Sequence, residues 1–197
     1  MQYDEFKMRN RFDLEELIAF SYGTLVDDPP DGFNGRLPAP PFLMIDRIIS
    51  IESNRNQGVM IAEQDVRFDA WFFQCHMPRD PVQPGCLCVD AIWQLLGFYC
   101  IWNGALGTGR ALGSEEIFFN GQVRPFNKIV RHEIDIRRFV YLKQSGATIV
   151  IGNSKSFVDG QLIMEIKNAR SGIFRDIAYT DYPRRSTNSV GGAISYE

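Results

Sequence analysis

The chain has 197 residues, which is enough for one well-filled hydrophobic core and short for two domains. Hydrophobic residues make up 45% and charged residues 23%, as in ordinary globular proteins. The net charge of −3 argues against non-specific binding to nucleic acid, and no basic amphipathic segment suggests binding to a membrane surface. No secretory signal follows the charged N-terminus, so a cytoplasmic protein is expected.

The predicted elements begin with a helix over residues 13–22, where Asp13 and Glu16 have capping-box spacing. Proline and glycine predict a loop over residues 27–41. Strand-like segments follow at about 44–52, 58–66, 110–122, 129–140, 147–158 and 161–174. From Thr180 the sequence is polar, so we expect one domain over residues 1–179 and a C-terminal extension over 180–197.

The segment 86–102 is apolar on every side except at Asp90 and Gln94. A helix of this kind belongs inside a protein, and this one is short for a transmembrane span and carries a carboxyl group. Several long consecutive strands and one apolar helix are most simply packed as a curved antiparallel sheet wrapped around that helix. The sequence therefore predicts an α+β fold.

The four cysteines lie close together and include two that flank a histidine-containing turn. They are Cys75, Cys86, Cys88 and Cys100. Three of them fall on the apolar helix, which is not typical of a disulfide framework. Their spacing with His76 fits no paired zinc motif, so small buried side chains are favoured over a metal site, and no metal is expected.

Three features near the start of the apolar helix suggest catalysis. An ionised Asp90 would be costly there, which favours a protonated carboxyl group able to act as a general acid, and Gln94 lies one turn on, where it can orient Asp90. Gly85 begins the helix, so its N–H is free to stabilise negative charge on a carbonyl oxygen. His76 precedes a proline-stiffened turn and is a candidate base, whereas His132 lies in a charged run and is expected at the surface.

The motifs around these residues resemble the bacterial β-hydroxydecanoyl-acyl-carrier-protein dehydratase/isomerase family over residues 13–176. They are Trp71-Phe72-Phe73-x-Cys75-His76, Asp80-Pro81-Val82-x-Pro84-Gly85-Cys86-Leu87, Asp90-Ala91-x-Trp93-Gln94, Gly109-Arg110-Ala111-Leu112-Gly113 and Gly121-Gln122-Val123-x-Pro125. The resemblance implies a hot-dog fold and a homodimer in which His76 of one subunit faces Asp90 of the other. Asp90 stands where a sister family of dehydratases has glutamate, which indicates the isomerase-type branch.

The resemblance also implies the reaction. His76 and Asp90 would dehydrate a β-hydroxyacyl thioester carried on acyl carrier protein, with the Gly85 amide on the thioester carbonyl and without any cofactor. Val82, Cys86 and Gln94 would support the site. Basic residues in one strand and its turn are candidates for docking the acidic carrier protein. They are Arg131, Arg137, Arg138 and Lys143.

Some positions depart from the family pattern. Met77 stands in place of an aromatic residue, and Gln83 and Cys88 replace a methionine and a glycine. These residues border the expected acyl pocket, so they affect which acyl chain length is preferred and whether isomerisation occurs. Two alternative functions stay open: a hot-dog thioesterase, which commonly lacks a histidine at this position, and a non-catalytic module that binds acyl thioesters.

Overall fold

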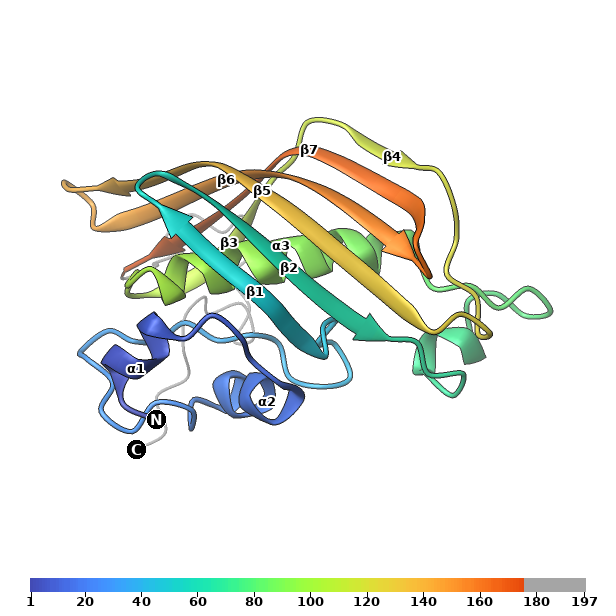
Figure 1. The fold of residues 1–197 in the computed structure, drawn as a ribbon, viewed down its shortest axis with the longest axis horizontal. Coiled ribbons are helices and arrows are strands. Elements are labelled where there is room, and N and C mark those ends of the chain that lie inside the picture. The colour runs from blue at the N-terminus through green and yellow to red at the C-terminus, as the bar shows by residue number, and fades with distance from the viewer. Residues whose placement is uncertain (176–197) are drawn as a thin grey trace, which may run out of the picture.

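A computed structural model of the chain describes residues 1–175; the predicted extension over 180–197 lies outside these residues. Antiparallel strands form one seven-stranded sheet in the order β1-β2-β5-β6-β7-β3, with β4 also paired to β7 (Figure 1). The strands are β1 (Arg47–Asn54), β2 (Gln57–Asp65), β3 (Thr108–Gly113), β4 (Ile117–Phe119), β5 (Ile129–Leu142), β6 (Ala147–Val158) and β7 (Gln161–Phe174).

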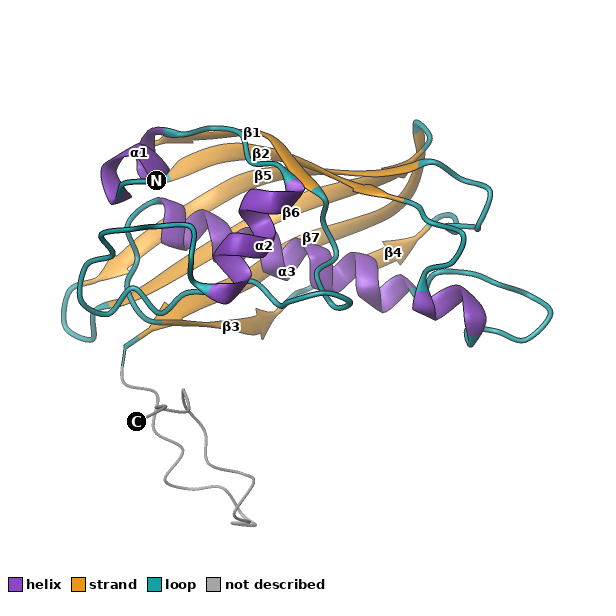
Figure 2. Cartoon of the chain, turned by 90° about the horizontal axis from the view of Figure 1, so that it is seen from below, coloured by secondary structure: helices purple, strands orange, loops and turns teal. Residues whose placement is uncertain are grey.

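The long helix α3 (Gly85–Trp102) lies along the concave side of this sheet (Figures 1 and 2). By length and composition it could cross a membrane, but most of its side chains are buried, and Ala91, Ile92 and Leu95 are fully enclosed in the core. Burial of this apolar surface is the main stabilising contribution to the fold. The sheet wrapped around one apolar helix is the hot-dog arrangement, which confirms the predicted fold class.

The N-terminal segment covers the C-terminal half of α3 on the side away from the sheet (Figure 2). It contains α1 (Tyr3–Met8) and α2 (Leu14–Tyr22), and the predicted capping box begins α2. The rings of Phe12 and Phe20 each lie 5.0 Å from the ring of Phe98 on α3. The N-terminal half of α3 has no such cover from this segment.

One strand prediction differs from the structure by more than a few residues at its ends. The segment 110–122, expected as one strand, is divided into β3 and β4 because the chain turns at Gly113, whose φ of 126° suits glycine. Between the predicted strands 147–158 and 161–174, the Asp-Gly pair typical of a hairpin turn joins β6 to β7, and Asp159 and Gly160 both have positive φ, as a two-residue hairpin turn requires.

His132 is buried, and its predicted surface position is wrong. Side chains alternate between the two faces of a strand, and on β5 the even-numbered positions Val130, His132 and Ile134 face the core. His132 is 0% exposed, and its Nδ1 lies 2.8 Å from Ser156 Oγ on β6. Burial lowers the pKa of His132 to about 4, so the imidazole is neutral at neutral pH.

This histidine should make the fold sensitive to acid. The unfolded chain takes up a proton near pH 6.5, whereas the folded chain resists protonation until about pH 4. Stability is therefore lost as the pH falls between these values, by roughly 3 kcal/mol in all. Urea unfolding across this range should show a smaller loss for His132→Gln than for the wild type; parallel curves would contradict the assignment.

Candidate active site

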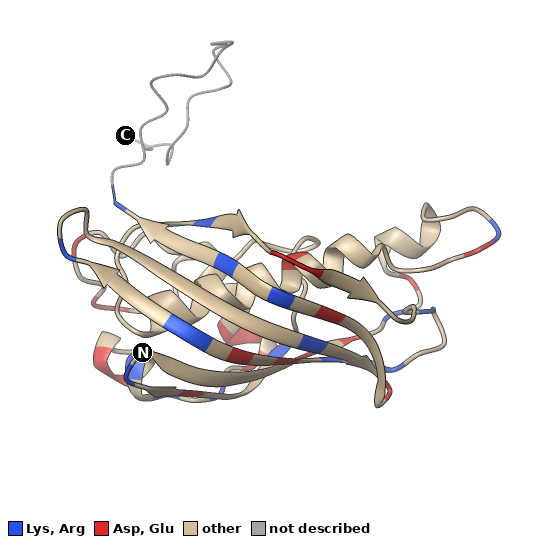
Figure 3. Ribbon diagram, turned by 90° about the horizontal axis from the view of Figure 1, so that it is seen from above, with Lys and Arg blue, Asp and Glu red and all other residues tan. Residues whose placement is uncertain are grey.

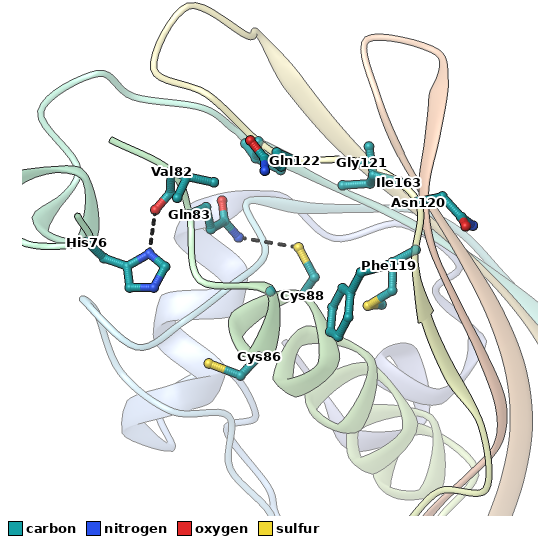
Figure 4. A pocket seen from close by; sticks show the side chains of 13 residues that line it. His76, Val82, Gln83, Cys86, Cys88, Phe119, Asn120, Gly121, Gln122 and Ile163 are labelled. Atoms are coloured by element: carbon teal, nitrogen blue, oxygen red, sulfur yellow. Dashed lines mark hydrogen bonds between the residues drawn. The ribbon is translucent and has the colours of Figure 1, made fainter. Parts of the chain in front are cut away.

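His76 is held in one orientation by the chain around it. It follows the short 3-10 helix η1 (Trp71–Gln74), and its N–H donates to Phe72 O at 2.8 Å. The ring Nδ1 lies 2.9 Å from the carbonyl oxygen of Val82 (Figure 4). Because a carbonyl can only accept, Nδ1 carries the hydrogen, and Nε2 of the neutral ring keeps a lone pair that can take a proton.

The turn between His76 and α3 is fixed from both sides. Val82 N–H donates to His76 O at 2.8 Å, and Gln83 N–H donates to Val123 O at 3.0 Å. Arg124 forms an ion pair with Asp80. Sequence reasoning missed Arg124, because a single arginine in an irregular segment has no pattern that would connect it to the turn.

Gly85 begins α3, and Pro84 before it provides no side-chain cap. The Gly85 amide has no acceptor within the helix and lies at the positive end of the helix dipole. Phe119 of β4 packs against this glycine: an ideal Cβ on Gly85 would lie 2.6 Å from the Phe119 ring. Phe119 could not be placed here from the sequence, because the contact joins segments far apart in the chain.

His76, Gly85 and Cys86 line the same pocket, which has a volume of about 610 Å³ (Figure 4). Gln83 and Cys88 line it as well and are almost completely buried, whereas Cys86 is exposed. Burial raises the pKa of the Cys88 thiol to about 12, so this thiol stays protonated and is not a nucleophile at neutral pH. A base and an amide that has no acceptor within its own helix therefore share a pocket that is large enough for a thioester and part of an acyl chain.

Asp90 is held by Gln94, as the helical spacing predicted. Gln94 Nε2 donates to Asp90 Oδ2 at 2.6 Å and to Phe42 O at 2.9 Å, while Gln94 Oε1 accepts from Met44 N–H at 3.0 Å. These three bonds fix the orientation of the Gln94 amide, so that its N–H group is directed at the Asp90 carboxyl group. The bonds to the loop before β1 could not be foreseen from local sequence.

Asp90 lies on a partly exposed stripe of α3, which also contains Cys86, Trp93 and Gly97. The residues of this stripe are four, three and four positions apart, so they share one helix face. Asp90 is not among the residues that line the pocket of His76. In the single chain the candidate acid thus lies on a partly exposed helix face, so the full burial expected for Asp90 from the apolar sequence is not observed, and the candidate base lies in the pocket.

The four docking candidates do not form one cluster on the outer face of the sheet, which Figure 3 shows with its charged residues. Arg131 is paired with Glu63 and Glu133. Arg137, which is paired with Asp135, and Arg138 line a hollow beside the turn between β1 and β2. Because β2 runs from that turn towards η1, this hollow lies at the end of the sheet opposite to His76.

Residues 37–167 match the FabA-like domain. The chain belongs to the FabA-like family. The match covers the strands from β1 to β6, the first half of β7, α3 and the turn with His76, and it confirms the resemblance seen in the motifs.

Solved structures resemble this FabA-like chain at low sequence identity. The dehydratase heterocomplex ApeI:P from Xenorhabdus doucetiae is 11% identical, with a TM-score of 0.49 over 70% of this chain and 86% of that chain. AziG from S. sahachiroi is 14% identical, with a TM-score of 0.42 over 64% and 90% of the two chains. A hypothetical thioesterase protein with coenzyme A from Streptococcus pneumoniae TIGR4 is 14% identical, with a TM-score of 0.41 over 64% and 83%.

Proposed function

We propose that this FabA-like protein dehydrates β-hydroxyacyl thioesters carried on acyl carrier protein. The observation that supports this most strongly is the pairing of His76 and the Gly85 amide in one pocket, with Val82 O holding His76 so that Nε2 is the free base. A base and an oxyanion donor at one place are what removal of a proton next to a thioester carbonyl needs. Asp90, oriented by Gln94, provides the acid.

In the proposed reaction His76 Nε2 takes the α-proton, and the electron pair moves towards the carbonyl oxygen, where the Gly85 N–H stabilises the negative charge. Asp90 then gives a proton to the β-hydroxyl group as the C–O bond breaks. Water leaves, and a trans-α,β-enoyl thioester remains. As a second activity, the same base would move a proton from the γ-carbon to the α-carbon and give the β,γ-cis product.

The proposal places the two halves of each site on different subunits of a homodimer. The partly exposed stripe of α3 supports this, because it carries Asp90 and the exposed Cys86 on a face that the N-terminal segment leaves open. A twofold symmetric contact through this face would bring the same stripe of each subunit towards the other. Each pocket would then gain an acid that its own lining residues lack.

A substrate panel separates this function from its alternatives. The purified protein is incubated with β-hydroxyacyl and acyl thioesters on carrier protein, and both enoyl product and free thiol are measured. The proposal predicts enoyl product only from the β-hydroxyacyl thioester. Free thiol without enoyl product would identify a thioesterase, and binding without either product would identify a binding module.

The proposed docking of acyl carrier protein through Arg137 and Arg138 can be tested by charge reversal. Changing both to glutamate is expected to raise the KM for the carrier-bound substrate and to weaken its salt dependence, because steering between exposed charges is screened over about 8–10 Å at physiological salt. A short thioester that needs no carrier should react as before.

The matched control reverses Lys155 and Lys167, which are exposed on β6 and β7 and paired with acidic residues. It changes the net charge equally and should leave the KM near the wild-type value. If the arginine variant loses activity equally with the carrier-bound and the short substrate, Arg137 and Arg138 support the fold and do not dock the carrier protein. Arg137 and Arg138 lie at the end of the sheet opposite to His76. A loss seen only with the carrier-bound substrate therefore cannot come from a direct contact with His76.

A further inference from the structure

Phe119 forms one wall of the pocket that His76 and Gly85 line. Its ring packs so closely on the first turn of α3 that a Cβ on Gly85 would lie 2.6 Å from the nearest ring carbon. More than half of the Phe119 side chain is nevertheless exposed, at 56%. Within residues 1–175, no other phenylalanine, tyrosine or tryptophan lines this pocket. Phe119 therefore lies at the boundary between the pocket and solvent.

The short strand β4 directs this side chain to the pocket. Phe119 is paired with Met164 on β7, which also lines the pocket. Successive side chains of a strand point to opposite faces, and the neighbouring Phe118 does not line the pocket. The ring of Phe118 instead lies 5.6 Å from Lys167 Nζ. The two adjacent phenylalanines of β4 are both exposed, but only Phe119 reaches the candidate site.

The rings of His76 and Phe119 lie on opposite sides of the first turn of α3 (Figure 4). Gly85 begins this turn, and in the proposed reaction its N–H binds the carbonyl oxygen of the thioester. The α-carbon is the next atom of the acyl chain after that carbonyl group. A thioester bound in this way has the base on one side of its α-carbon and the phenyl ring on the other.

Removal of the α-proton fixes how the α-carbon is turned. The C–H bond that breaks must point at His76 Nε2 and stand perpendicular to the plane of the carbonyl group, because its electron pair then moves towards the carbonyl oxygen. The remaining substituent of the α-carbon is therefore directed away from His76, to the side of Phe119. A hydrogen atom fits against the ring, whereas a methyl group would overlap with it or displace the carbonyl oxygen from the Gly85 amide.

We propose that Phe119 is a specificity-determining residue, which restricts this protein to acyl chains without a substituent on the α-carbon. The inference rests on the proposed function and names its substrate class: β-hydroxyacyl thioesters with a CH₂ group next to the carbonyl group. Because the ring faces the base across the α-carbon, it excludes an α-methyl group of one configuration. The imidazole of His76 excludes the other configuration, in which the methyl group takes the place of the proton to be removed.

The test measures binding without turnover. β-Hydroxyacyl pantetheine amides, in which an amide replaces the thioester, are compared by calorimetry as the unbranched chain and as its two α-methyl diastereomers. The wild-type protein should bind the unbranched amide at least about tenfold more tightly than either α-methyl amide. Phe119→Ala should restore the affinity for one diastereomer only, and Phe119→Leu should change it in the same direction. Phe118→Ala, the same change on the other face of β4, should leave all three affinities as they are.

Equal affinity of the wild-type protein for branched and unbranched amides would overturn the proposal, because the ring would then exclude nothing. Recovery of neither diastereomer, or of both equally, in Phe119→Ala would overturn it as well, since the ring would not face the base. If no amide binds the wild-type protein, this inference and the proposed function fail together. A failure of dehydration alone, seen in the substrate panel, leaves these affinities readable and is thus distinguished from a failure of this inference.

Discussion

Asp90→Asn is expected to lower the rate of dehydration by about 10²–10⁴-fold while leaving the fold intact. Asparagine has nearly the same shape, and its side-chain oxygen can still accept the hydrogen bond that Gln94 Nε2 donates to Asp90 Oδ2. What it lacks is a proton that can be given to the leaving hydroxyl group. The change therefore removes the acid and keeps its surroundings.

The measurement is the initial rate of enoyl formation, together with the melting temperature and the affinity for an acyl-pantetheine amide. Asp31→Asn, the same change at an exposed position in the loop before β1, is the matched control and should keep the wild-type rate. Near-normal dehydration by Asp90→Asn would show that Asp90 has a structural role and would remove the acid from the mechanism.

His76→Ala should abolish both dehydration and exchange of the α-proton. Exchange isolates the first step, because it needs only the base and the stabilised enolate and no loss of water. Substrate incubated in heavy water with the wild type should gain deuterium at the α-carbon. Substrate incubated with the variant should gain none above the rate without protein.

A second variant tests whether the loss of activity in His76→Ala comes from a disturbed turn and not from the loss of the base. His76→Gln keeps a side-chain N–H that can reach Val82 O, the present partner of Nδ1, but it offers no basic nitrogen. It should be as inactive in exchange as His76→Ala. Deuterium incorporation at the wild-type rate in either variant would show that another group is the base.

The parts of this fold that could be predicted are those with local patterns. The apolar segment that became α3, the capping box of Asp13 and Glu16 and the turn at Asp159-Gly160 depend on neighbours a few residues apart. His132 was misplaced because its charged neighbours Arg131 and Glu133 suggested a surface. On a strand such neighbours point to the opposite face, so they are compatible with a buried residue between them.

The site was predictable to a similar extent. The relation between Asp90 and Gln94 follows from helical spacing, but the bonds from Gln94 to Phe42 and Met44 join residues about fifty positions apart. Phe119 against Gly85 is a contact of the same long-range kind. No local pattern encodes such contacts, because they depend on how the whole sheet closes around α3.

The most direct test of the central claim combines the two inactive variants in one dimer. His76→Ala and Asp90→Asn chains carrying different affinity tags are co-expressed, and the mixed dimer is isolated through both tags. If His76 of one subunit works with Asp90 of the other, one of the two sites in this dimer is intact, and about half the wild-type rate of dehydration should return. A mixed dimer as inactive as its parents would contradict the shared site and the mechanism built on it.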